Sequence, residues 1–370
     1  MLELRLRRAG PEIPLDVALS CAQGELLALV GPSGSGKTSV LRAIAGLLPV
    51  ESGRVVVAGQ VWTDSATGLH RPPEARRVGM VFQHYALFPH LDAVDNVALG
   101  LPTRLSRALA REHAQSLLAD MRLADLGHRR PHELSGGQRQ RVALARALAR
   151  ATGDGEPGVL LLDEAFAAVD QPTRHALWDE LMRLRERHPL PVVMVTHDLH
   201  EARLLADQLC IVDGGQALQC GAPERVLAGP RNARVAELVG LRDVFSARFE
   251  KAAPGEACLH WGTERLSTRD KNRIDEGTLV HWVVSGEFVH LHREPLVGPN
   301  VLRARVERLR RLGDSAHLLL HLPGPEARLH QTLSAREVAA LRLEEGAQIW
   351  VHLDPRGLHV MPVKTGEPAP

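Results

Sequence analysis

Residues 31–38 of the chain form the stretch Gly31-Pro32-Ser33-Gly34-Ser35-Gly36-Lys37-Thr38. It follows the apolar run Leu26–Val30, which predicts a buried strand, and it opens Thr38–Leu48, which has the pattern of a helix. Glycines let backbone N–H groups turn inward around phosphate oxygens, and the helix N-terminus adds positive potential. Lys37 would neutralise the outer phosphates, and the Thr38 hydroxyl would ligate Mg²⁺. The stretch therefore predicts a nucleotide-phosphate site, which many classes of protein possess.

Short apolar strands alternate with helical segments on both sides of this loop, up to about Gly240. The further predicted strands are Val78–Phe82, Val159–Leu162 and Val192–Thr196, and the further predicted helices are Gln138–Arg150 and Thr173–His188. Continuous apolar runs of this length are typical of parallel strands that are buried on both faces. The alternation of strand and helix predicts an α/β domain.

Two carboxylates, Asp163 and Glu164, directly follow the apolar run Val159–Leu162. At the carboxyl end of a central strand, Asp163 could hold Mg²⁺ through water, and Glu164 could orient the water that attacks a phosphate. A solvated strand end explains an isolated Asp-Glu pair about equally well. The catalytic interpretation therefore depends on the other motifs.

A second glycine-rich segment, Leu134-Ser135-Gly136-Gly137-Gln138, precedes one of the predicted helices. Ser135 and two bare glycine amides at a helix N-terminus can face a γ-phosphate. An ordinary helix cap would explain Ser135, but not the double glycine and Gln138. With the residues that follow, Arg139 to Leu148, the segment closely resembles the signature of the ABC ATPases. The phosphate loop, the signature and the Asp-Glu pair also come in the order of that family.

The resemblance covers about residues 1–240 and implies a P-loop ABC ATPase domain, with a parallel-sheet core, an antiparallel β subdomain and a helical subdomain. It implies that ATP and Mg²⁺ bind here. Gln83 matches the glutamine that touches Mg²⁺ and the attacking water, and His197 matches the histidine that contacts the γ-phosphate. Asp170 fits the loop that crosses the dimer interface.

The resemblance also implies a partner. Two copies would associate head to tail, so that the phosphate loop of one copy meets Ser135, Gly136, Gly137 and Gln138 of the other. Two ATP molecules would lie between them. Only one such domain is present in the 370 residues, so we expect a homodimer or a partner copy.

The sequence departs from the family at four places. No aromatic residue precedes Trp62 to stack on adenine, and the guanidinium of Arg7 or Arg8 could stack instead. Ala165 replaces the usual proline after the catalytic glutamate, and Ala167 replaces a serine that could form a hydrogen bond across the dimer. We expect a slower or less tightly coupled ATPase. The Gly-rich acidic stretch 151–158 is interpreted as a surface insertion.

After Gly240 the predicted strands become shorter and are punctuated by Gly and Pro. The segments Val244–Glu250 and Val301–Glu307 resemble each other, which indicates two copies of one small β unit. We expect a pair of five-stranded barrels over residues 241–364, preceded by a connecting helix and linker over Pro223–Arg234. The tail Thr365–Pro370 is expected to be disordered.

This second region resembles the all-β tandem OB-like (TOBE) barrels of importer ATPases for oxyanions, sugars, polyamines and iron. Residues 61–65, 72–79 and 87–91 look like molybdate importer ATPases, and residues 326–346 look like their molybdate-binding barrel. Parts of these segments are shared with sulfate importers, and the signature Gln138 is often Glu in the molybdate branch.

The second region could also bind a small oxyanion, with Thr332, Ser334 and Arg336 as candidate ligands. The favoured alternative is that Ser334 and Glu337 form a capping box for a short helix, Ala335–Leu341. The many histidines after His260 have irregular, strand-like spacing, which favours solvated or cross-strand roles over a metal site.

The chain as a whole has a net charge of +1, so its charge does not indicate nucleic acid as a partner. Its four cysteines form no CxxC pair, so we expect neither a metal site nor a disulfide, as in a reducing cytoplasm. No run resembles a signal peptide or approaches the roughly 20 apolar residues of a membrane span. Contact with a membrane would go through a partner, and we expect a peripheral location on the cytoplasmic face of the inner membrane.

Three functions from different classes fit this pattern. The first is the ATPase of an importer, most plausibly for molybdate, with sulfate, iron or polyamine as alternatives; its partners would be a permease and, through it, an extracytoplasmic binding protein. The second is a soluble ABC ATPase of DNA repair or translation, which lacks support because the chain has no long coiled coil and no second ATPase domain. The third is a cytoplasmic anion sensor with a weak ATPase.

Overall fold

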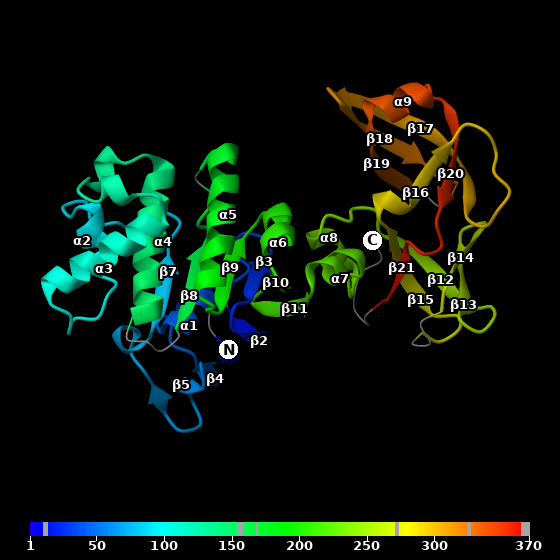
Figure 1. The fold of residues 1–370 in the computed structure, drawn as a ribbon. Coiled ribbons are helices and arrows are strands. Elements are labelled where there is room, and N and C mark those ends of the chain that lie inside the picture. Colours follow the sequence, from blue (N-terminus) through cyan, green and yellow to red (C-terminus); the bar gives the residue numbers. More distant parts are fainter. Residues whose placement is uncertain (10–13, 154–157, 168, 271–273, 324–326, 364–370) are drawn as a thin grey trace. The chain divides into compact units, whose positions relative to one another are not determined.

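The structure is a computed structural model, and it describes residues 1–9, 14–153, 158–167, 169–270, 274–323 and 327–363 (Figure 1). The chain divides into two compact units, Met1–Glu224 and Arg225–Pro370. The division falls within helix α7 (Pro223–Ala228), inside the predicted linker. The boundary expected between residues 240 and 241 stays a prediction.

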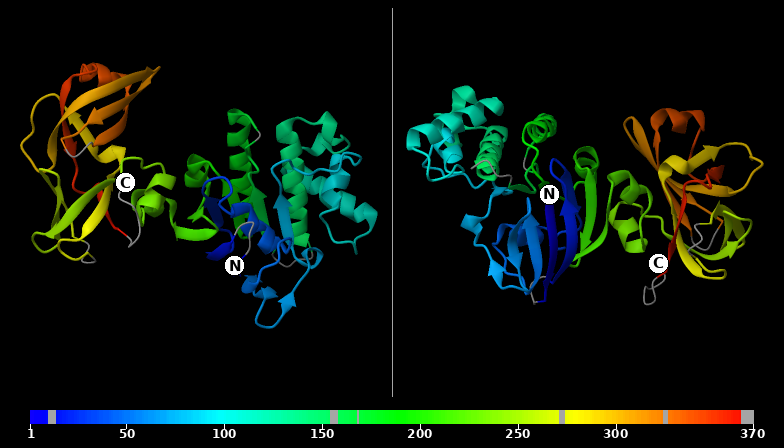
Figure 2. Two further views of the ribbon diagram at one scale, coloured as in Figure 1. Left: turned by 180° about the vertical axis from the view of Figure 1, so that it is seen from behind. Right: turned by 60° about the horizontal axis from the view of Figure 1, so that its bottom comes forward.

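The first unit is built on one eleven-stranded sheet with the order β6-β5-β4-β1-β2-β11-β10-β3-β9-β8-β7. The last five strands of that order run parallel, while the strands at the other end pair antiparallel. The antiparallel strands near the N-terminus are blue in the turned views of Figure 2. The strands are β1 Leu2–Arg8, β2 Leu15–Cys21, β3 Leu26–Val30, β4 Ser52–Val57, β5 Gln60–Asp64, β6 Leu69–His70, β7 Val78–Val81, β8 Val159–Asp163, β9 Val192–Thr196, β10 Gln208–Asp213 and β11 Gln216–Gly221.

Burial explains the two kinds of strand. Leu26–Val30 and Val192–Thr196 are buried along their whole length, as expected for parallel strands that are covered on both faces. The antiparallel strands β1 and β2 alternate buried and exposed residues instead, so one face packs on the core and the other meets solvent. The predicted parallel core and antiparallel β subdomain are therefore confirmed.

The helices of the first unit cover the sheet and form a helical subdomain. They are α1 Lys37–Ala45, α2 Ala93–Ala98, α3 Arg107–Asp120, α4 Gly136–Thr152, α5 Gln171–Arg187 and α6 Leu199–Leu205, with short 3₁₀ turns at Pro73–Ala75, Ala124–Leu126 and Pro131–Glu133. Helices α2 and α3 pack on each other and on α4. All the predicted helices are present, with bounds that differ by a few residues. Of the predicted surface insertion, residues 154–157 lie outside the described residues, as does the tail 364–370.

A disulfide joins Cys210 to Cys220, so the expectation that the cysteines stay unpaired is wrong in the structure. The two residues lie directly opposite each other in the antiparallel register of β10 and β11. Sequence spacing alone does not reveal this pairing, because it depends on the register of the hairpin. Cys21 and Cys258 are free and buried.

The second unit contains two five-stranded sheets, ordered β14-β13-β12-β15-β21 and β16-β20-β17-β18-β19. Their strands are β12 Phe245–Lys251, β13 Glu256–Trp261, β14 Glu264–Arg269, β15 Leu279–Val284, β16 Val289–His292, β17 Val301–Leu312, β18 Ser315–His321, β19 Arg328–Ser334, β20 Gln348–Leu353 and β21 Leu358–Pro362. The accompanying helices are α7, α8 (Ala233–Leu238) and α9 (Ala335–Ala340), with a 3₁₀ turn at Gly286–Phe288.

The predicted repeat is present and the unit has two five-stranded sheets, as expected, but neither sheet is made from one copy alone. The resembling segments form β12 and β17, which are the middle strands of the two sheets. Each sheet takes its fifth strand from the other half of the unit: β21 pairs with β15, and β16 pairs with β20. The two sheets share one hydrophobic core, which includes the packed rings of Phe245, Trp261 and Trp282. Exchange of the edge strands makes the two halves depend on each other.

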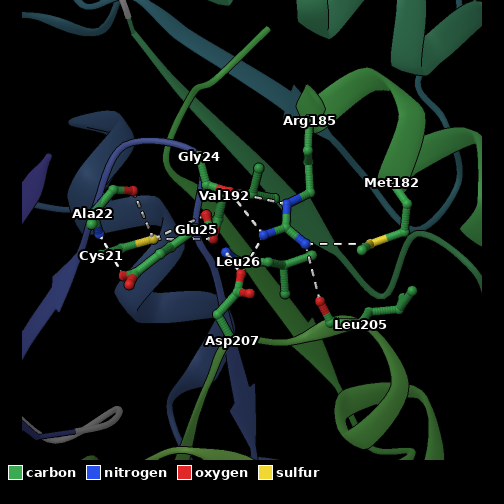
Figure 3. Close-up of polar contacts among 10 residues, drawn as sticks. All are labelled: Cys21, Ala22, Gly24, Glu25, Leu26, Met182, Arg185, Val192, Leu205 and Asp207. Atoms are coloured by element: carbon green, nitrogen blue, oxygen red, sulfur yellow. Dashed lines mark hydrogen bonds and ion pairs between the residues drawn. The ribbon is translucent and has the colours of Figure 1, made fainter. Parts of the chain in front are cut away.

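A polar cluster anchors the amino end of β3, the strand that leads to the phosphate loop (Figure 3). The guanidinium of Arg185 on α5 donates to the carbonyl oxygens of Gly24 at 2.8 Å and Leu205 at 3.2 Å, and it forms an ion pair with Asp207. The Asp207 carboxylate also accepts from the backbone N–H of Leu26 at 2.7 Å. One side chain thus ties together α5, the segment after α6 and the turn before β3.

Replacement of Arg185 by Met should lower the free energy of unfolding by about 2 kcal/mol, because it leaves two carbonyl groups without this donor and Asp207 without its ion-pair partner. Only 9% of the Arg185 side chain is exposed, so water cannot fully replace it. Urea unfolding followed by circular dichroism at 222 nm measures the change.

Arg187→Met is the matched control, because Arg187 lies on the same helix and its ion pair with Asp120 at 2.7 Å is exposed. Exposed pairs contribute at most about 1 kcal/mol. Equal effects of the two substitutions would mean that the cluster around Arg185 has no special role in anchoring β3.

Candidate nucleotide-binding site

The predicted phosphate loop lies between β3 and α1, where close approach and backbone geometry require glycine. A Cβ atom on Gly31 would come within 1.9 Å of the carbonyl oxygen of Val212. Gly36 has φ 100° and caps α1, in the left-handed region that favours glycine. The loop therefore keeps its backbone N–H groups near the N-terminus of α1, as a phosphate site requires.

Lys37 is folded back over this loop. Its Nζ donates to the carbonyl oxygens of Gly31 at 2.9 Å and Pro32 at 2.7 Å, and it lies 3.3 Å from Ser35 Oγ. Burial lowers the pKa of Lys37, and the nearby charges of Glu164 and Asp163 act in the opposite direction. Phosphate oxygens could replace these carbonyl partners without unfolding the loop.

Two of the predicted magnesium ligands are brought together. The Thr38 hydroxyl on α1 donates to Asp163 Oδ1 at the end of β8, at 2.9 Å. Burial raises the pKa of Asp163, and the hydrogen bond from Thr38 opposes that shift. Within the described residues, no cluster of three or more His, Cys, Asp and Glu side chains could hold a metal by itself. The pair fits Mg²⁺, which takes few protein oxygens and completes its shell with phosphate and water.

Glu164 and His197 also lie together, 3.6 Å apart between Oε2 and Nδ1. They follow the adjacent parallel strands β8 and β9, whose carboxyl ends meet at one edge of the sheet. Glu164 has φ 47°, a backbone conformation that residues other than glycine adopt rarely and that often occurs at functional sites. The His197 side chain is 63% exposed, so both polar groups can reach a ligand.

Gln83 lies at the same edge of the sheet, but among the described residues it has no hydrogen bond to the other candidate residues. It follows β7, in which Val81 pairs with Leu162 of β8, so Gln83 and Glu164 lie equally far beyond this pair. Its side chain is exposed, and no hydrogen bond in the described part of the chain links it to the phosphate loop or to Asp163.

The signature residues form the start of α4. Ser135 is the N-cap residue: its hydroxyl accepts from the backbone N–H of Gln138 at 3.3 Å, and the Gln138 side chain accepts from the N–H of Ser135 at 2.8 Å. A Cβ atom on Gly136 would meet open space, so this side of the helix start is accessible. Asp170 caps α5 and is exposed. Among the described residues, no hydrogen bond or ion pair joins Ser135, Gln138 or Asp170 to the phosphate loop.

Two residues near the site were not singled out from the sequence. Gln140 on α4 is buried and donates to the carbonyl of Ala165, directly after Glu164. Arg174 on α5 donates to the carbonyl of Val169 and lies 3.9 Å from Asp198. A polar Gln140 among apolar helix positions was the available sequence signal, but its partner is 25 residues away.

An apolar groove of about 540 Å³ lies elsewhere on the first unit, beside the segment that contains Gln83. Residues from α1, β7 and α4 line it, together with residues from the segments that follow β7 and α2; among them are Met80, Phe82, Phe88, Leu99 and Arg146. The exposed fractions of Phe88 and Leu99 are 45% and 56%, which is high for such large apolar side chains.

The remaining candidates are the possible oxyanion ligands of the second unit and the arginines that could stack on adenine. Ser334 caps α9 and forms the predicted capping box with Glu337, so the structural interpretation of Ser334 is confirmed. Thr332 and Arg336 are exposed. Arg7, a candidate for stacking on adenine, pairs with Asp16 at 3.3 Å, and its stacking role stays a prediction, as does that of Arg8.

Several histidines of the second unit have the predicted cross-strand partners. His260 on β13 pairs with Glu250 on β12, and the rings of His290 and His352 lie opposite each other on β16 and β20. No helix among the described residues is long and apolar enough to cross a membrane.

Comparison with known proteins identifies relatives over nearly the whole chain. The family described as ABC transporter matches residues 15–167, and the family described as TOBE domain matches residues 283–361. The spermidine/putrescine import ATP-binding protein PotA of Pseudomonas fluorescens is 34% identical over 92% of this chain and 92% of that protein. The sulfate/thiosulfate import ATP-binding protein CysA of Ralstonia nicotianae is 37% identical over 96% and 93%. The Fe(3+) ions import ATP-binding protein FbpC of Agrobacterium fabrum is 40% identical over 69% and 70%.

Solved structures resemble the first part of the chain. The dimeric structure of MJ0796, a bacterial ABC transporter cassette, has a TM-score of 0.50 and 31% identity, and the match covers 60% of this chain and 99% of that one. A post-hydrolysis state of MJ0796 bound to ADP and Pi has the same TM-score and coverage with 29% identity. The full-length relatives, the two matching families and the site geometry agree: this chain belongs to the family of ABC importer ATP-binding proteins that carry a TOBE domain.

Proposed function

We propose that this chain hydrolyses ATP to drive uptake of a tetrahedral oxyanion, most specifically molybdate, through a membrane permease. The observation that carries the ATPase assignment is the meeting of Thr38 with Asp163 and of Glu164 with His197 at one edge of the sheet. Molybdate is supported by residues 61–65, 72–79, 87–91 and 326–346, which resemble molybdate importers. Sulfate is the second candidate, because CysA of Ralstonia nicotianae is similar over almost the whole chain. Iron and polyamine remain alternatives, since FbpC and PotA are also relatives.

In the proposed mechanism, the loop from Gly31 to Thr38 holds the phosphates of ATP, and Lys37 exchanges its carbonyl partners for phosphate oxygens. Thr38, Gln83 and Asp163 are the proposed ligands of Mg²⁺, which when bound neutralises charge on the phosphates. Glu164 would take the proton of the attacking water, with His197 contacting the γ-phosphate. The 3.6 Å separation of these two side chains allows both to act on one phosphate group.

The second ATP contact would come from another copy of the chain. Ser135, Gly136, Gly137, Gln138 and Asp170 have no bond to the phosphate loop of their own copy within the described structure, and the side of Gly136 is open. The dimeric state of MJ0796 supports a homodimer. A helix N-terminus in the partner would add donors for the γ-phosphate.

The permease would dock in the apolar groove lined by Met80, Phe88 and Leu99. The groove is beside the segment after β7, so movement of a bound permease helix would reach Gln83 directly. In this proposal the chain lies on the cytoplasmic face of the inner membrane, and it meets the extracytoplasmic binding protein only through the permease. The candidate oxyanion ligands of the TOBE domain are then Thr332 and Arg336, since Ser334 already caps α9.

Glu164→Gln should give a stable dimer in the presence of ATP and Mg²⁺, because nucleotide binding is kept while hydrolysis stops. Hydrolysis should fall by about 100-fold or more, the range expected for loss of a general base. Size-exclusion chromatography with light scattering measures the dimer. A variant that stays monomeric with MgATP would argue against two ATP molecules held between two copies.

Leu99→Asp should abolish stimulation of the ATPase by the permease, because it places a charge in the apolar groove. The basal rate of the isolated chain should stay unchanged. Leu204→Asp on α6 is the matched control, since Leu204 is 54% exposed and lies outside the groove. Reconstituted vesicles give both rates. Loss of stimulation in both variants, or in neither, would contradict the proposed docking site.

The substrate is tested with the chain reconstituted with its cognate permease in vesicles. We expect molybdate-loaded binding protein to stimulate ATP hydrolysis and sulfate-loaded binding protein to leave it unchanged. Stimulation by sulfate alone would replace molybdate by the second candidate. Basal hydrolysis without stimulation by any oxyanion would overturn the oxyanion proposal and favour iron or polyamine. Direct effects of oxyanion on the isolated chain would favour the sensor function.

A further inference from the structure

Gln140 is buried in a place where a polar side chain is costly. It lies on α4, two residues after the signature residue Gln138, and only 1% of its surface is exposed. Its Nε2 donates to the carbonyl oxygen of Ala165 at 2.7 Å. Its Oε1 has no hydrogen-bond partner. Burial of an amide whose oxygen is unpaired costs free energy. The bond from Gln140 to the Ala165 carbonyl is therefore the interaction that accounts for a glutamine at this position.

The carbonyl that Gln140 holds belongs to the residue directly after Glu164. Glu164 has φ 47°, and its N–H donates to the carbonyl of Val195 on β9 at 3.1 Å. This unusual conformation persists only if neighbouring groups hold it in place. Gln140 holds the carbonyl of Ala165, in the peptide that joins Ala165 to Phe166. The backbone at and directly after Glu164 is therefore bonded to both β9 and α4.

The start of α4 also contacts the far end of the same segment. A Cβ atom on Gly137 would come within 2.6 Å of Thr173 Cγ2, in the first turn of α5. The N–H of Thr173 in turn donates to Asp170, the N-cap of that helix. Helix α4 therefore contacts the chain on both sides of the loop between Glu164 and α5, through Gln140 and Gly137.

We propose that Gln140 is a positioning residue that sets the orientation of the Glu164 carboxylate for hydrolysis. The inference rests on the proposed role of Glu164 as the base. Because Gln140 is on the signature helix, contact of the signature with a nucleotide held by the partner copy would move the Ala165 carbonyl and the peptide after Glu164. Gln140 would thus link one nucleotide site of the dimer to the catalytic base of the other.

The first test is Gln140→Met, which keeps the length and volume of the side chain and removes the donor. We expect kcat to fall about 10-fold, with less than about a 2-fold change in KM for ATP or in binding of a fluorescent nucleotide, because the phosphate loop is untouched. Gln115→Met is the matched control: Gln115 Nε2 also donates to a carbonyl, that of Ala124, at 2.7 Å. It should leave kcat unchanged.

A second measurement separates positioning of Glu164 from a general structural role. In the Glu164→Gln background, Gln140→Met should lower the residual single-turnover rate by less than about 2-fold, since the group that it positions is already gone. A further 10-fold loss in that background, or equal changes of kcat and KM in the single variant, would overturn the inference. A normal rate for Glu164→Gln would instead overturn the proposed function.

Gln140→Glu gives a second test, based on pH, that does not require the fold to accept methionine at position 140. A carboxyl buried at this position should have a raised pKa, and its protonated form can donate to the Ala165 carbonyl. Relative to the unsubstituted chain, kcat of Q140E should therefore be close to normal near pH 6 and should fall as the pH rises and the carboxyl ionises. A ratio of the two rates that is independent of pH would contradict the proposed hydrogen bond.

Discussion

The parallel register of β3, β9 and β8 is the constraint on which the nucleotide site depends. Leu26 pairs with Val192 and Leu160 pairs with Val192, so the three strands end together at one edge of the sheet. The phosphate loop follows β3, His197 follows β9, and Asp163 and Glu164 lie at the end of β8. No one of these segments could form the site alone, because Thr38 and Asp163 are 125 residues apart in sequence and in hydrogen-bond contact in the fold.

Polar side chains that reach backbone carbonyls hold this edge and the opposite end of β3 in place. Arg185 does so at the start of β3, where it joins Gly24, Leu205 and Asp207. Gln140 does so at the end of β8, through Ala165. Both come from helices and bind carbonyl groups far away in sequence. Burial of such donors is favourable only when the bond is made, so each one specifies a single arrangement of helix and strand.

The TOBE-containing unit shows how a duplicated segment becomes one folding unit. Its two sheets have the same order of strands around β12 and β17, but β21 and β16 are exchanged between them. Because each sheet contains one strand from the other half, neither half can complete its sheet without the other. A common core follows directly, with buried residues from both sheets in contact.

The sequence was enough to predict the α/β class, the main strands and helices of the first unit, the phosphate loop and the capping box at Ser334. These are local features: apolar runs, glycines and helix caps act through residues a few positions apart. It also determined the repeat of the second unit, because both copies carry the same pattern. Only the folded chain reveals the Cys210–Cys220 pair, the exchange of β16 and β21, and the contact of Gln140 with Ala165. Each depends on strand register or on helix packing across long separations, which local pattern does not encode.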